Sequence, residues 1–117
     1  MNILTFIAIS LVIVLHILFL VLETFLWNTA FGRKTFGLSE EYAKQSAVLA
    51  ANQGLYNGFL AAGLIWGLLS TDGFEVLLFF LGCIIIAGIF GGITAKAPIL
   101  WIQALPAAVA MLLLIFS

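Results

Sequence analysis

Four long runs of almost uninterrupted apolar residues dominate this chain of 117 residues. Each run is close to the roughly 20 residues that a helix needs to cross a hydrocarbon layer of about 30 Å. Hydrophobic residues make up 65% of the chain and charged residues only 8%, whereas a soluble domain has about 45–50% and about 25% of these. A water-soluble fold of this size cannot bury so much apolar surface. The sequence therefore predicts a protein whose solvent is lipid.

The apolar runs predict an all-α, polytopic membrane protein, a four-transmembrane-helix bundle that forms one domain over residues 1–117. The expected spans are residues 3–27, 47–69, 74–90 and 98–116. The first run has no basic residue before it and no small-residue cleavage site after it, which indicates a retained span and not a signal peptide.

Glycine, serine and acidic residues predict where the second helix begins. Gly32 and Gly37 are expected to break the first helix in the connection that follows it. Ser39 is a good N-cap, and Glu40 and Glu41 then lie favourably at the positive end of the helix dipole. From Ser39 we expect one unbroken helix that projects from the membrane before it enters the second span.

The remaining connections are short. Residues 70–73 read Ser-Thr-Asp-Gly, which predicts a tight turn, and Gly91 with Gly92 is expected to end the third span. Pro98 suits the first turn of the last helix, where its missing N–H costs little. Pro106 lies in the middle of that span and predicts a kink.

The basic residues predict the orientation. Arg33, Lys34 and Lys44 lie between the first two spans and Lys96 lies between the last two, so all four basic residues fall on one side of a four-span protein. The positive-inside rule places that side in the cytoplasm and both termini outside. The expected location is therefore the cell membrane, in multi-pass form.

Polar side chains inside the expected spans are the candidates for function. Ionisable residues in spans cost about 2.5–3.5 kcal/mol on insertion scales and almost always face the bundle interior. We expect the polar side chains of these spans to form two layers in the cytoplasmic half of the bilayer. The candidate set is His16, Glu23, Asn52, Gln53, Tyr56, Asn57 and Gln103.

Small residues at spacings of four predict faces where helices approach closely. Such faces also predict a possible homo-oligomer. The pairs are Gly54 with Gly58, Gly63 with Gly67, and Gly88 with Gly92.

Several of these features together resemble a known family. The resemblance lies in the run ANQGLYNGFLAAGL at residues 51–64, in His16 and Glu23, in the stretch FLW at 25–27 and in the loop from Gly32 to Leu38. These features are similar to small bacterial integral membrane proteins grouped as domain of unknown function 1304. The likeness covers essentially the whole chain. It implies a four-helix membrane protein and no established activity.

The polar set leaves four functional readings open. The leading hypothesis is a cytoplasm-facing intramembrane pocket that binds a small molecule, a lipid headgroup or an ion. A purely structural network of interhelical hydrogen bonds is the first alternative. An intramembrane isomerase-type enzyme, with His16 or Glu23 as acid or base, is the second. A small transporter or channel that works as an oligomer is the third.

Composition argues against other classes. The net charge of −1 gives no reason to expect a nucleic acid partner. One cysteine, Cys83, and one histidine are too few for a disulfide or a zinc site built from this chain alone. We therefore expect no metal and no cofactor, with the lipid bilayer as the main partner.

Overall fold

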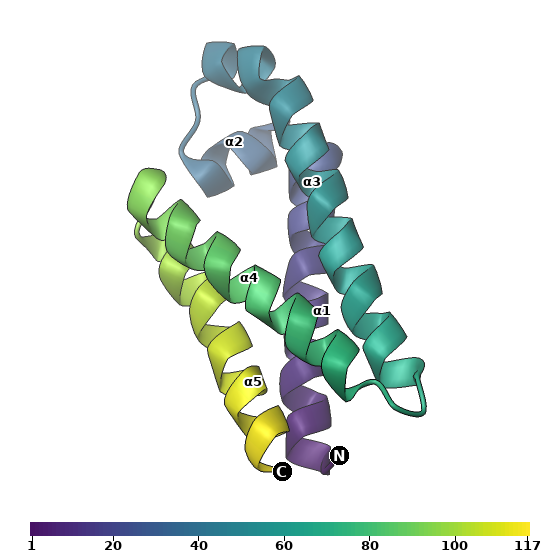
Figure 1. Ribbon diagram of the computed structural model, residues 1–117. Helices are drawn as coiled ribbons and strands as arrows, with labels where there is room; N and C mark the ends of the chain where they lie inside the picture. Colours follow the sequence, from purple (N-terminus) through teal and green to yellow (C-terminus); the bar gives the residue numbers. More distant parts are fainter. The chain divides into compact units, whose positions relative to one another are not determined.

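The computed structural model describes all residues 1–117 and contains helices and no strands, which confirms the expected all-helical class. The elements are α1 (Ile3–Thr24), α2 (Ala30–Phe36), α3 (Glu40–Leu69), α4 (Phe74–Thr94), the π-helical turn η1 (Leu100–Ala104) and α5 (Leu105–Phe116) (Figure 1).

Two of these helices are both long enough and apolar enough to cross a membrane, namely α1 with 22 residues and α4 with 21. The apolar helix over Leu100–Phe116 is shorter. The 30-residue α3 is long enough but less apolar, because the part of it beyond its charged first turns carries the amides of Asn52, Gln53 and Asn57. By length and composition, α1 and α4 are therefore candidate membrane spans.

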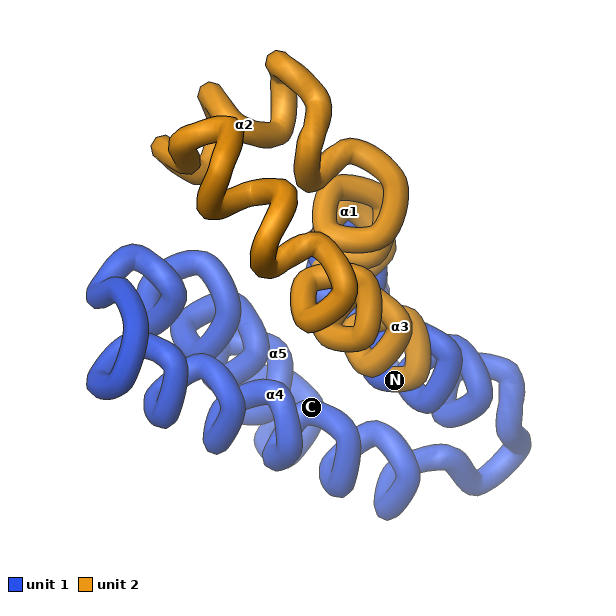
Figure 2. Tube along the Cα trace, turned by 90° about the horizontal axis from the view of Figure 1, so that it is seen from above, with its two compact units in different colours: residues 1–15, 60–117 blue, residues 16–59 orange.

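The chain forms two compact units, which Figure 2 colours separately. Unit 1 comprises residues 1–15 and 60–117, and unit 2 comprises residues 16–59. Helices α1 and α3 each contribute residues to both units.

Unit 1 contains an apolar core to which α1, α3, α4 and α5 all contribute. Its buried residues are Ile9, Val12, Ile13, Ala61, Leu64, Leu77, Leu81, Ile84, Ala107, Ala110 and Leu114. Within this unit, α4 and α5 lie side by side (Figure 1). A Cβ added at Gly88 would meet the backbone nitrogen of Ala104 at 2.6 Å. Glycine therefore allows α4 to approach the last helical segment closely.

The start of α3 agrees with the expectation from the sequence. The backbone N–H of Tyr42 donates to Oγ of Ser39 at 3.1 Å, so Ser39 caps the helix. Glu40 and Glu41 occupy the first turn, and the helix continues without a break to Leu69. The turn at residues 70–73 is also present between α3 and α4.

The connection after α1 contains a short helix that the sequence analysis did not predict. Helix α1 ends at Thr24, before the expected limit at residue 27. Thr29 then caps α2 by accepting a hydrogen bond from the backbone N–H of Gly32 at 3.1 Å. Gly37 ends α2 in the left-handed region with φ 67°, a conformation that favours glycine. The expectation that Gly32 and Gly37 break the first helix is therefore wrong, because α1 ends before both of them; Gly32 lies inside α2, and Gly37 ends α2.

The expectation that Gly91 and Gly92 end the third span is wrong. Helix α4 continues through both residues to Thr94. A Cβ at Gly91 would meet Cγ2 of Ile99 at 3.0 Å, and one at Gly92 would meet Cβ of Leu100 at 2.9 Å. These glycines therefore serve close packing against the next segment and do not terminate the helix.

Pro106 is accommodated by a change in helix winding. The five residues Leu100–Ala104 form a π-helical turn, and α5 follows at once with Pro106 in its first turn. Proline lacks an N–H and its ring clashes with the carbonyl four residues earlier. A wider turn before proline relieves that clash. The distortion that the sequence predicts at Pro106 is therefore a π-helical turn.

Candidate functional site

Two residues of the polar set meet inside unit 2. Glu23 lies near the end of α1 and Asn57 lies in the middle of α3. The side-chain amide of Asn57 donates a hydrogen bond to Oε1 of Glu23 with an N–O distance of 2.5 Å. Asn57 is only 4% exposed, and Glu23 is partly buried. The structure therefore joins an acid and an amide across two helices.

Glycine brings the two helices close enough for this contact. A Cβ at Gly54 would meet Cβ of Glu23 at 3.2 Å and the carbonyl oxygen of Leu20 at 3.1 Å, and it would collide with the hydroxyl of Thr24. At Gly58 it would meet Cδ1 of Leu20 at 2.5 Å. The Gly54 and Gly58 face that the sequence analysis singled out therefore packs against α1 within unit 2.

Thr24 is a site residue that the sequence analysis missed. Its Oγ1 is buried and has no hydrogen-bond partner. Buried hydroxyls are almost always hydrogen-bonded, because an unpaired polar group away from water costs about 1–3 kcal/mol. A threonine at a helix end ordinarily bonds to nearby backbone groups and so attracts no notice in a sequence. The only signal in the sequence was that Thr24 follows Glu23. The Thr24 hydroxyl adds an unused donor and acceptor beside Glu23.

His16 is fully buried in unit 2. Its ring packs edge-on against Phe19, with ring centroids 5.5 Å apart and planes at 77°. His16 and Glu23 are seven residues apart on α1, which separates them by about 10 Å along the helix axis. His16 therefore lies deeper in the first helix than the Glu23–Asn57 pair.

The remaining polar residues of α3 lie on its exposed surface. Asn52 and Gln53 are exposed, and Tyr56 is 55% exposed. The Tyr56 ring packs edge-on against Phe59 with centroids 5.5 Å apart. Helical geometry turns Asn52 about 140° away from Asn57. The structure therefore does not bring these residues to the Glu23–Asn57 pair.

Gln103, the seventh residue of the set, belongs to η1 and hence to unit 1. It is partly buried there.

Aromatic and hydroxyl groups form a set of contacts around α2 in unit 2. Nε1 of Trp27 donates a hydrogen bond to Oγ of Ser46 at 3.0 Å, and the Trp27 ring stacks on Phe36 with centroids 5.0 Å apart. The guanidinium of Arg33 donates to the backbone carbonyl and side-chain oxygens of Asn28 at 3.0 and 3.1 Å. These contacts join α2 and α3 to the segment that follows α1.

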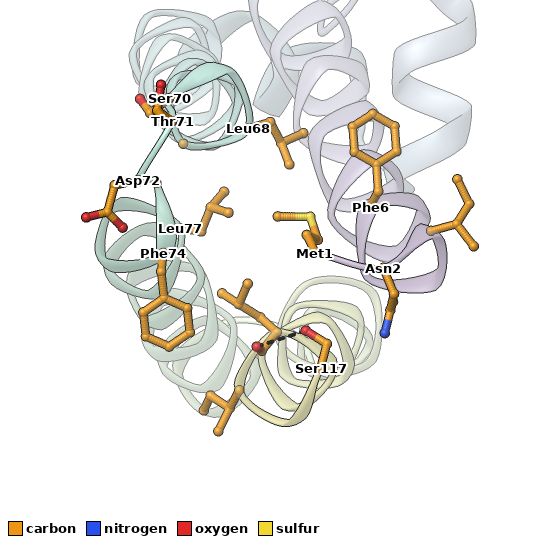
Figure 3. A pocket seen from close by; sticks show the side chains of 15 residues that line it. Met1, Asn2, Phe6, Leu68, Ser70, Thr71, Asp72, Phe74, Leu77 and Ser117 are labelled. Atoms are coloured by element: carbon orange, nitrogen blue, oxygen red, sulfur yellow. Dashed lines mark hydrogen bonds between the residues drawn. The ribbon is translucent and has the colours of Figure 1, made fainter.

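Two cavities lie in unit 1. The larger has a volume of about 870 Å³, and Figure 3 shows Leu68, Leu77 and Met1 pointing into it while Asp72 points away. The smaller, of about 290 Å³, is lined by Trp66, Glu75 and three apolar neighbours. Neither is lined by a residue of the polar set. No three His, Cys, Asp or Glu side chains lie together in a way that could hold a metal ion.

Comparison with known proteins matches this chain to one protein family and to one curated relative. The family model described as "Protein of unknown function (DUF1304)" matches residues 10–115. The chain is similar to the uncharacterized protein YpaA of Lactococcus lactis subsp. lactis (strain IL1403), with 33% identity over 107 residues, or 88% of this chain and 89% of that protein. No solved structure matches the chain. The chain therefore belongs to the DUF1304 family of proteins of unknown function.

Proposed function

We propose that this is a four-span protein of the cell membrane that binds a small ligand at the Glu23–Asn57 pair. The ligand class that we propose is a small group with hydrogen-bond donors and a positive charge, such as a protonated amine, a lipid headgroup of that kind or an ion. The spans are α1, the apolar part of α3, α4 and the helix over Leu100–Phe116, with both termini outside.

The apolar surface supports the membrane placement. Large hydrophobic side chains are exposed along α1, α3, α4 and α5; examples are Leu4, Leu69, Phe79 and Phe116. Soluble monomers rarely expose large contiguous apolar patches. The charge pattern supports the orientation, since the connections that hold Arg33 and Lys96 share one side when both α3 and α4 cross the membrane.

One observation carries the binding proposal, namely the hydrogen bond from the Asn57 amide to the Glu23 carboxyl. A carboxylate has about four acceptor positions, and the amide uses one of them. Beside it, the Thr24 hydroxyl is unpaired and buried. A ligand with N–H donors and a positive charge would satisfy the remaining acceptor positions of the carboxylate, because hydrogen bonds to ionised groups are about twice as strong as neutral ones.

The test is a titration of the purified protein in detergent micelles with ethanolamine hydrochloride. We expect the thermal unfolding midpoint to rise, because a ligand that binds only the folded state stabilises it. Tetramethylammonium chloride, a cation without N–H donors, is the matched salt and is expected to have a smaller effect. No shift with ethanolamine in the wild type would contradict the amine assignment.

The variant Glu23→Gln removes the charge and keeps the shape. We expect it to lose the response to ethanolamine. The matched control is Glu75→Gln, the same change at an exposed residue of unit 1, which is expected to respond as the wild type does. An equal response in Glu23→Gln and wild type would place any binding elsewhere.

A structural role is the second candidate, and the tight packing at Gly54 favours it. In that case the Glu23–Asn57 bond only joins α1 to α3. The same experiment separates the two functions: a structural network predicts that Glu23→Gln unfolds at a lower temperature and that ethanolamine shifts neither protein.

A further inference from the structure

The exposed amides of α3 need a partner that the isolated chain does not supply. Val48, Asn52, Leu55 and Phe59 follow one another at spacings of four, three and four residues. Such spacing places all four on one face of a helix. We call this face the α3 seam. Its three apolar members are exposed by 81% at Val48, 50% at Leu55 and 53% at Phe59, and Asn52 is exposed as well.

Most of the seam, from Asn52 to Phe59, lies where lipid would otherwise surround it. Counting about 20 residues back from the end of α3 at Leu69 places the inner limit of the hydrocarbon near Ala50. Asn52 thus falls just inside that limit, and its side chain is too short to reach far toward water. An amide buried against lipid without a hydrogen-bond partner costs free energy. A protein surface that supplies a donor and an acceptor removes this cost.

The glycine faces that favour helix association are already used within the chain. Gly54 and Gly58 pack against α1, Gly63 against Phe80 and Gly67 against Leu77. Self-association through these faces would require the chain to open. The α3 seam is free of such contacts because its members are exposed.

We propose that the α3 seam binds the same seam of a second copy of this chain. Copies of one multi-pass protein share an orientation in the membrane, so a twofold axis along the membrane normal brings two α3 helices together in parallel at equal depth. Asn52 then faces Asn52. Each amide carries both a donor and an acceptor, so two identical amides satisfy one another.

The spacing of the seam fits this partner. Its intervals of four, three and four residues follow the alternating pattern of a heptad seam, in which the full repeat averages 3.5 residues and gives a left-handed helix pair. A single asparagine within such a seam fixes the register and the number of helices. The inference rests on the membrane placement proposed above and not on ligand binding, so a failed ethanolamine titration leaves it intact.

The first test maps the contact by disulfide formation in liposomes. The native thiol is removed with Cys83→Ala, and single cysteines are introduced by Leu55→Cys on the seam or Phe79→Cys on α4, which is 64% exposed. We expect oxidation to give a covalent dimer with Leu55→Cys and little with Phe79→Cys. Equal crosslinking at both positions would indicate random collisions and would overturn the proposal.

The second test measures the role of the amide. Energy transfer between donor-labelled and acceptor-labelled copies is followed while the protein is diluted in phosphatidylcholine liposomes. We expect Asn52→Leu to raise the dissociation constant about three- to twentyfold, the range of interhelical hydrogen bonds in membranes. Asn52→Gln keeps an amide and is expected to lie closer to the wild type. A wild type that is monomeric at all dilutions, or an unchanged constant in Asn52→Leu, would overturn the proposal.

Discussion

At the scale of single residues, the bond between Glu23 and Asn57 is the most informative contact of the molecule. An acid in an apolar helix is costly unless a neighbour satisfies it. Here the neighbour is an amide on another helix, at 2.5 Å. Asn57 thus joins α3 to α1 within unit 2 and fixes the position of the Glu23 carboxyl oxygen that accepts its bond.

The first prediction concerns that amide. Asn57→Leu removes the donor and leaves the Glu23 carboxyl without this partner. We expect a loss of about 1–3 kcal/mol in the free energy of unfolding. The measurement is unfolding by sodium dodecyl sulfate in mixed micelles, followed by circular dichroism.

Asn52→Leu is the matched control for Asn57→Leu. It is the same chemical change on the same helix, at an exposed position. In dilute, monomeric protein we expect a change within about 0.5 kcal/mol, as for most surface substitutions. Equal losses in the two variants would show that the Glu23 contact contributes nothing specific.

The candidate site was only partly accessible to sequence reasoning. Charge and helical periodicity selected Glu23 and Asn57 as polar residues of neighbouring spans. Periodicity gave no means to decide which face of α3 meets α1, so Asn52 and Tyr56 were grouped with them although both are exposed. The face of α3 that meets α1 is decided by close packing at Gly54, which depends on the three-dimensional structure.

At the scale of elements, glycine packing decides which helices lie together. The second prediction tests this at Gly54. Gly54→Ala would drive a methyl group into the Thr24 hydroxyl and the Leu20 carbonyl. We expect a loss of about 1–3 kcal/mol in the free energy of unfolding, typical of overpacking. The same detergent titration measures it.

Gly82→Ala serves as its counterpart on α4. A Cβ there meets only Cε of Met111, at 3.7 Å, which is ordinary van der Waals contact. Alanine is also the better helix former by about 1 kcal/mol. We therefore expect Gly82→Ala to be neutral or slightly stabilising. A loss as large as that of Gly54→Ala would mean that helix approach is not the cause.

Helix ends that depend on the chemistry of nearby residues could be predicted from the sequence. Helix ends that depend on packing against other segments could not. The cap at Ser39 and the unbroken α3 follow from residue chemistry alone. Helix α2 has only seven residues, and a helix that short is marginal without tertiary contacts. The glycine pair at 91 and 92 looked like a stop signal, because the sequence does not reveal the segment that packs against it.

At the scale of the whole molecule, large apolar side chains are exposed along α1, α3, α4 and α5, and charged residues are few. Of the four basic residues, Arg33, Lys34 and Lys96 lie outside the long helices and Lys44 lies near the start of α3. Two helices pass the test of length and composition for a membrane span. In the four-span arrangement that we propose, the connections that hold Arg33 and Lys96 face the cytoplasm and the turn between α3 and α4 faces outside.

The third prediction tests that arrangement with a membrane-impermeant maleimide. In a Cys83→Ala background, we expect Thr71→Cys, in the turn between α3 and α4, to be labelled in intact cells. Thr35→Cys, in α2, is expected to react only after the cells are permeabilised. The reverse pattern would invert the orientation, and labelling of both in intact cells would contradict the span count.

The wide turn over Leu100–Ala104 also sets the phase of everything that follows it. One residue more or less rotates a helix by about 100°. A π-helical turn, with its i→i+5 bonding, holds about one residue more than an α-helical turn, so removing one residue from it would give a regular α-helix and leave Ala107, Ala110 and Leu114 in the apolar core. Removing one residue between Ala107 and Ala110 would instead carry Ala110 and Leu114 out of that core. We therefore expect natural variants to tolerate a deletion at the wide turn more readily than one within α5.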